Sequence, residues 1–88
     1  MRKNMTEAEI KTALLRYNKL SEERADAAYM WRHAGESGCY ESRWSICMEE
    51  MSRIRDDLRV CGYELASTGY KKVGKVQHEE YKIVPVNS

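Results

Sequence analysis

The sequence predicts an α+β fold: a long antiparallel helical hairpin at about residues 6–34 and 39–61, followed by a small C-terminal antiparallel β-hairpin or three-stranded sheet at about residues 63–86. Two stretches with apolar residues at heptad spacing, separated by glycines, predict the helices. Aromatic and β-branched residues that gather after the second stretch predict the strands. With 88 residues, the chain is expected to form a single domain over residues 1–88, because ordinary domains have roughly 100–150 residues.

The first helix is predicted to begin at a capping box. The Thr6 hydroxyl can accept a hydrogen bond from the backbone N–H of Glu9, and the Glu9 carboxylate can accept one from the N–H of Thr6. Apolar residues then follow in two heptad columns, Ile10, Tyr17 and Trp31 in one and Ala13, Leu20 and Ala27 in the other. Arg24 interrupts this stripe. Neither Gly nor Pro occurs before Gly35, so the helix should have about 27 residues.

The second helix is predicted to fold back on the first after a tight turn at Gly35–Gly38. Its apolar columns are Trp44, Met51 and Leu58 on one side and Cys47, Ile54 and Cys61 on the other. If the hairpin closes near residues 36–38, facing residues have numbers that sum to about 75, so Leu20 should meet Met51 and Ile54. The alternative is that the two stripes pack elsewhere. Gly62 is expected to end the helix in a left-handed conformation.

The C-terminal third is predicted to be β-structure. The first of its two runs of β-type residues ends at Val76 and the second begins at Tyr81. The polar residues 77–80 between them are therefore expected to form the turn. Residues 63–67 are either a third short strand or the last turn of the helix, because Leu65 continues the heptad. Pro85 should lie at an edge or a strand end, since it has no N–H to donate.

The cysteines do not suggest a disulfide framework or a metal site. Cys39, Cys47 and Cys61 are an odd number with no metal-ligand spacing, which favours a reducing cytoplasm. Cys47 and Cys61 lie on the apolar stripe and are expected to be buried as small hydrophobic residues. His33 with Cys39 gives fewer ligands than the four of a structural zinc site, so no metal or cofactor is expected.

The charge balance excludes two classes of nucleic-acid-related protein. Fifteen basic and fourteen acidic residues give a net charge of +1, which fits neither a strongly basic coat protein nor an acidic DNA mimic. No apolar run approaches the ~20 residues that cross a bilayer, so no membrane contact is expected. Ion pairs at four-residue spacing, such as Lys19 with Glu23, should lie on solvated helix faces.

The predicted β-hairpin is locally basic. Residues 70–76 contain three lysines and no acid. Lysines and tyrosines on a hairpin can contact phosphates and stack on bases, whereas lysines also protect an exposed sheet edge from aggregation. The candidate contacts with a partner or nucleic acid are Tyr70, Lys71, Lys72, Lys75, Tyr81 and Lys82.

A second contact surface is suggested by residues beside or within the helical stripe. Arg24 either extends along the groove to solvent, pairs with Glu49 or Glu50, or contacts another chain. The candidate oligomer contacts are Arg24, Tyr29, Met30, Ile46 and Val60. A homodimer with a four-helix arrangement would cover them, and so would a larger partner.

These observations predict a small non-enzymatic protein-binding or regulatory module that acts through its helical surface or sheet edge, of a type common among phage and mobile-element accessory proteins. The alternative is a nucleic-acid-binding protein in which a homodimer presents the basic hairpin, with salt-sensitive affinity. An enzyme would need a site built from His33 and Cys39, or from His78 with Glu79 and Glu80.

Overall fold

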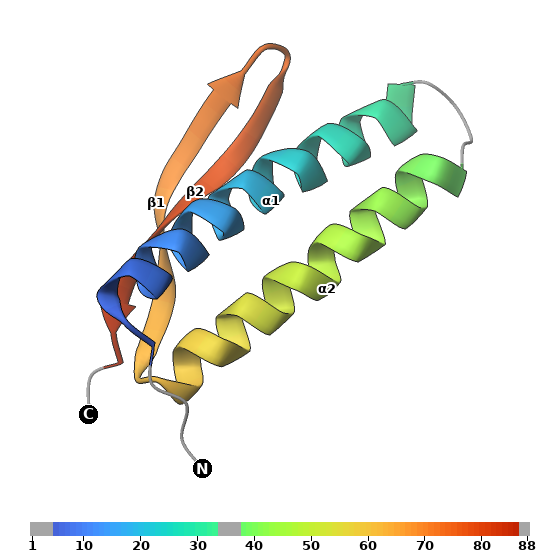
Figure 1. Ribbon diagram of the computed structural model, residues 1–88. Coiled ribbons are helices and arrows are strands. Elements are labelled where there is room, and N and C mark those ends of the chain that lie inside the picture. The colour runs from blue at the N-terminus through green and yellow to red at the C-terminus, as the bar shows by residue number, and fades with distance from the viewer. Residues whose placement is uncertain (1–4, 34–37, 87–88) are drawn as a thin grey trace.

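The computed structural model describes residues 5–33 and 38–86 and shows two helices followed by two strands (Figure 1). This confirms the predicted α+β arrangement, and within these described residues the sheet has two strands, not three. The elements are α1 (Glu7–His33), α2 (Gly38–Val60), β1 (Tyr63–Val73) and β2 (Val76–Pro85). Helices α1 and α2 run antiparallel, and the β-hairpin returns along α1 (Figure 1).

Local signals define the helix ends. The Thr6 N–H donates to Glu9 Oε1 at 2.8 Å and the Glu9 N–H donates to Thr6 Oγ1 at 3.2 Å, so the capping box forms as predicted. Helix α1 has the expected 27 residues. Gly62 follows α2 with φ of 89°, the left-handed conformation expected of a terminating glycine. The turn predicted at Gly35–Gly38 lies, except for Gly38, outside the described residues.

The hydrophobic core forms where the two heptad stripes meet the part of the hairpin that contains Leu65 and Tyr81. Tyr17 and Leu20 of α1 and Cys47 and Met51 of α2 form one buried cluster, so the predicted meeting of Leu20 with Met51 is confirmed. Partly buried residues from α2 and both strands pack against this cluster, namely Ile54, Leu65 and Tyr81. Leu65 lies in β1, so residues 63–67 begin this strand and are not the last turn of the helix.

The turn of the β-hairpin differs from the prediction. Strand β1 pairs with β2 up to Val73 and Val76, so the turn is Gly74–Lys75, and the turn predicted at residues 77–80 is wrong. Gly74 has φ of 63°, which a two-residue hairpin turn needs at its first position. Residues 77–80 stay in the strand despite their polarity because α1 covers β2 there. Pro85 ends β2, as expected.

A β-bulge divides β1 into two parts. The register shifts between Ser67 and Gly69, so Thr68 has no partner residue on β2. A bulge bends its strand and increases the local twist. Before the bulge, Leu65 reaches the core. Beyond it, residues 70–73 are all exposed and the hairpin extends toward its tip beside α1 (Figure 1).

Helix α1 closes the outer edge of β2 with polar side chains. The Asn18 amide donates from Nδ2 to the Tyr81 carbonyl at 3.2 Å and accepts the Tyr81 N–H at Oδ1, at 2.9 Å. One turn further, Ser21 Oγ donates to the Glu79 carbonyl at 2.7 Å, and Ser21 is fully buried. Side chains of α1 thus make the hydrogen bonds that a third strand would make.

Replacing Asn18 should destabilise the fold. We expect Asn18→Ala to lower the free energy of unfolding by about 2 kcal/mol, because it leaves the backbone N–H and C=O of Tyr81 without partners in a partly buried position. Alanine favours helices more than asparagine does, so helix propensity opposes this loss. Urea unfolding followed by circular dichroism measures it. The exposed α1 variant Lys11→Ala is the control, and equal effects of the two substitutions would contradict the assigned role.

Candidate functional site

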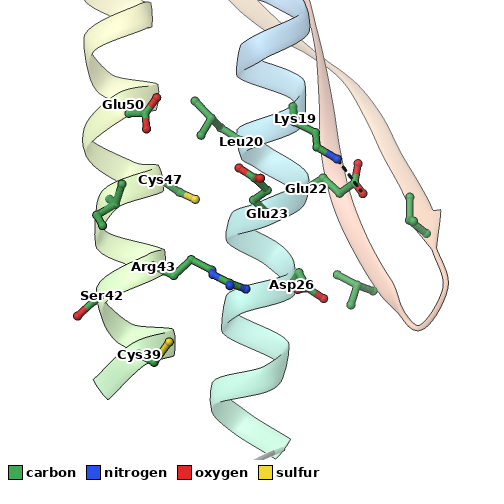
Figure 2. Close-up of a pocket in the computed structure, with 13 residues that line it drawn as sticks. Lys19, Leu20, Glu22, Glu23, Asp26, Cys39, Ser42, Arg43, Cys47 and Glu50 are labelled. Atoms are coloured by element: carbon green, nitrogen blue, oxygen red, sulfur yellow. Dashed lines mark ion pairs between the residues drawn. The ribbon is translucent and has the colours of Figure 1, made fainter. Parts of the chain in front are cut away.

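An open groove lies between α1, α2 and the tip of the hairpin, with a volume of about 670 Å³ (Figure 2). Leu20 and Cys47 lie at its base and are buried. Ile46 of α2 and Val73 of β1 line it while remaining 56% and 40% exposed, and Val76 lies beside them. The groove therefore offers apolar surface to solvent in a concave place, where a bound side chain would be desolvated.

The sides of this groove are acidic. Its lining includes four carboxylates, Glu22, Glu23, Asp26 and Glu50, but only two cations, Lys19 and Arg43. Figure 2 shows Glu23 and Arg43 extending from opposite helices into the space between them. Because like charges are gathered around a shared space, the groove has a negative local potential in a chain whose net charge is +1.

Ion pairs neutralise only part of this charge. Lys19 Nζ lies 4.0 Å from Glu22 Oε2, so Lys19 pairs with Glu22 and not with the predicted Glu23. Glu50 Oε2 lies 2.8 Å from Arg16 Nη2. Glu23 and Asp26 make no ion pair within 4.0 Å among the described residues. Their carboxylates are therefore available to a basic partner.

Arg24 connects the two helices within one chain. Its Nη1 donates to Met48 Sδ at 3.3 Å, while Glu50, one of its two predicted partners, pairs with Arg16. Of the alternatives for Arg24, the pairing with Glu50 is thus not formed, and the guanidinium contacts Met48 of the other helix.

The other four candidate oligomer contacts do not form a single patch. Tyr29 stacks on His33, with ring centroids 4.3 Å apart, and Met30 is half-buried. Ile46 and Val60 are both exposed but lie fourteen residues apart on α2, about 21 Å along the helix axis. Of these residues, Ile46 is the one that lines the groove.

The three cysteines differ in accessibility. Cys39 is exposed at the start of α2, Cys61 is half-buried and Cys47 is buried, and no disulfide joins cysteines of the described residues. Burial raises the pKa of the Cys47 thiol, and the Glu23 and Glu50 carboxylates raise it further. Cys47 therefore stays protonated at neutral pH and is a weak nucleophile. Within residues 5–33 and 38–86, no group of three or more metal-ligating side chains lies together.

The residues of the basic hairpin are dispersed over several surfaces. Lys71 and Lys72 are consecutive in β1, so their side chains point to opposite faces of the hairpin. Lys75 lies in the turn, and Lys82 pairs with Ala66 beyond the bulge. Tyr70 is 67% exposed, whereas Tyr81 packs edge-on against Tyr17 in the core, with ring centroids 4.9 Å apart.

Polar groups of β2 hold one another in place. The Tyr81 hydroxyl donates to Glu79 Oε1 at 2.5 Å. Burial, followed by this hydrogen bond to a carboxylate, raises the pKa of Tyr81 to about 12. The hydroxyls of Tyr81 and then Ser67 hold the pKa of Glu79 below its ordinary value. His78 is 4% exposed, and its Nδ1 lies 3.6 Å from Glu80 Oε2.

No protein-family model, curated protein or solved structure matches this chain. In the part of the chain that the structure describes, neither helix is long and apolar enough to span a membrane.

The groove is not visible in the sequence because its lining comes from four elements, α1, α2, β1 and β2. Its one sequence signal is local, because Glu22, Glu23 and Asp26 place three carboxylates within five residues. Val73 and Val76 lie in the first of the two β-type runs, and nothing in that run indicates contact with the helices. Only the position of the hairpin tip beside α1 brings these residues together.

The Tyr81 hydroxyl should make stability depend on alkaline pH. Its pKa is about 12 in the folded chain and 10.0 in the unfolded chain, so the folded state holds the proton more tightly. The stabilisation is therefore complete below pH 10 and is lost as the pH rises toward 12. Urea midpoints over this range should fall more steeply in the wild type than in Tyr81→Phe. Parallel curves for the two proteins would contradict this assignment.

Proposed function

We propose that this chain is a non-enzymatic protein-binding module that holds a segment of a partner protein in the groove between α1, α2 and the hairpin tip. The observation that carries this proposal is the concave apolar surface, with exposed Ile46 and Val73 beside buried Leu20 and Cys47. Burying apolar side chains in a concave site removes both surfaces from water, which is the main favourable term in protein association.

The charge of the groove indicates a basic partner segment. Glu23 and Asp26 are without ion pairs among the described residues, and an apolar anchor flanked by Lys or Arg would complement them. Such complementarity speeds association and excludes acidic competitors. We place this interaction in the cytoplasm, because an odd number of cysteines suits a reducing compartment.

The alternative nucleic-acid function has less support. Lys71 and Lys72 lie on opposite faces, and Tyr81 packs in the core, so the candidate residues do not form one basic surface for a phosphate backbone.

A homodimer remains the alternative way to cover Ile46. Sedimentation equilibrium separates the two cases, since a dimer that Ile46→Gln dissociates would identify a second copy as the occupant.

Peptide selection tests the groove directly. Peptides selected from a random display library on the wild-type protein should bind Ile46→Gln about 10-fold more weakly, because a buried isoleucine side chain contributes roughly 1.5–3 kcal/mol. The affinities are measured by fluorescence anisotropy with synthetic peptides.

Leu15→Gln is the matched control for this experiment. Leu15 is an exposed apolar residue of α1 that does not line the groove, and it is 72% exposed. Its replacement should leave the affinity unchanged. Selected peptides that bind wild type and Ile46→Gln equally well would contradict a binding site in the groove.

The electrostatic part of the proposal has its own test. The double variant Glu23→Gln/Asp26→Asn should bind a selected basic peptide several-fold more weakly and show a smaller loss of affinity as salt increases, because salt screens exposed charges. Asp56→Asn/Asp57→Asn removes the same charge from exposed positions of α2 outside the groove. Equal losses in both double variants would indicate a general charge effect and contradict the assigned role of Glu23 and Asp26.

A further inference from the structure

The two edges of the β-hairpin differ in how their backbone groups are bonded. On β2, the N–H and C=O of Tyr81 and the C=O of Glu79 point outward and bond to Asn18 and Ser21 of α1. In an antiparallel pair, residues alternate between facing the neighbouring strand and facing away from it. These bonds therefore identify Tyr81 and Glu79 as residues whose backbone faces away from β1.

The strand register shows which residues of β1 also have backbone groups that face away from the partner strand. Tyr70 pairs with Glu79, and Lys72 pairs with Gln77, two residues before Glu79. Residues opposite each other in an antiparallel ladder face either toward or away from the partner together, so the N–H and C=O of Tyr70 and Lys72 point away from β2. Both residues are exposed, and within the described residues no backbone hydrogen bond from outside the hairpin reaches them.

This free edge is accessible in the fold. Near the hairpin tip, β1 lies on the side of β2 that is remote from α1 (Figure 1). The bulge at Thr68 bends β1 between its core-packed part and its exposed part, so the free edge covers Gly69–Val73. One edge of the hairpin is thus closed by a helix and the other is open to a further strand.

We infer that the β1 edge at Gly69–Val73 binds an extended acidic segment of a partner protein, which adds to the hairpin as a third strand. Backbone hydrogen bonds to Tyr70 and Lys72 would provide the pairing. Lys71 and Lys72 point to opposite faces and Lys75 lies in the adjoining turn, so acidic side chains on either face of the added strand would meet a lysine.

The same lysines argue against a second copy as the occupant. Pairing two β1 edges would bring the lysines of both strands together, and like charges on adjacent strands destabilise the pairing. The lysines thus disfavour self-association and favour an acidic strand. The pairing residues Tyr70 and Lys72 do not line the acidic groove, which shares Val73 with this edge.

Hydrogen–deuterium exchange of the full chain provides the first test. The probe is a synthetic peptide of about seven residues that alternates Glu with Val or Thr, two residue types that favour extended strands. In the free protein, the amides of Tyr70 and Lys72 should exchange faster than the amide of Lys71, which faces β2. Adding the acidic peptide should slow exchange at Tyr70 and Lys72 at least several-fold. A peptide that binds without slowing these two amides would overturn the inference.

Two substitutions at one position provide the second test. Tyr70→Pro removes an N–H that does not bond to β2 and places a ring on the free edge, whereas Tyr70→Thr keeps the N–H and favours a strand. The acidic peptide should bind Tyr70→Thr like the wild type and Tyr70→Pro about 10-fold more weakly. The exchange experiment on the wild type decides the question should Tyr70→Pro disturb the fold.

The remaining outcomes separate the partner classes. A matched peptide with Lys in place of Glu should bind much more weakly, and equal binding would overturn the acidic assignment. A dimer in sedimentation equilibrium that Tyr70→Pro dissociates would identify a second copy as the occupant and overturn the inference. Ile46→Gln should leave the acidic peptide's affinity unchanged, so failure at this edge and failure at the groove are distinguishable.

Discussion

The pairing of the Asn18 amide with the backbone of Tyr81 is the interaction on which the arrangement of the hairpin depends. An isolated two-stranded hairpin is marginally stable in water, and its edges carry unpaired N–H and C=O groups. Asn18 both donates and accepts at Tyr81, and Ser21 satisfies the next outward carbonyl at Glu79. These bonds attach β2 to α1 along its edge and leave β1 as the strand on the other side of the hairpin.

The same attachment explains why a polar segment lies in a strand. Residues 77–80 contain no aliphatic side chain, yet they form regular ladder pairs with β1. His78 is buried and lies near Glu80, while Glu79 accepts the hydroxyl hydrogen bond of Tyr81. Polar groups are tolerated in such a position when each finds a partner. Local hydrogen bonds thus replace the apolar packing that a strand of this kind normally has.

The two proposed contacts use surfaces of opposite charge. The groove is lined by Glu22, Glu23, Asp26 and Glu50, whereas the free edge of β1 carries Lys71 and Lys72 next to Lys75 in the turn. A net charge of +1 conceals this separation, because charge acts locally over about a Debye length of 8–10 Å. A module with this distribution would hold a basic segment and an acidic strand at distinct places near one end of the fold.

The sequence by itself determined the features that depend on near neighbours. Thr6 with Glu9 marked the start of the first helix, Gly62 marked the end of the second, and heptad spacing identified Leu20 and Met51 as facing core residues. The tertiary structure alone decided the turn at Gly74–Lys75, the edge contacts of Asn18 and Ser21, and the groove. Asn18 lies 63 residues from Tyr81 and Ser21 lies 58 residues from Glu79, and neither stands out as a strand partner in its own helix. Such contacts depend on how α1 meets β2 in three dimensions, and periodicity along one segment carries no information about that.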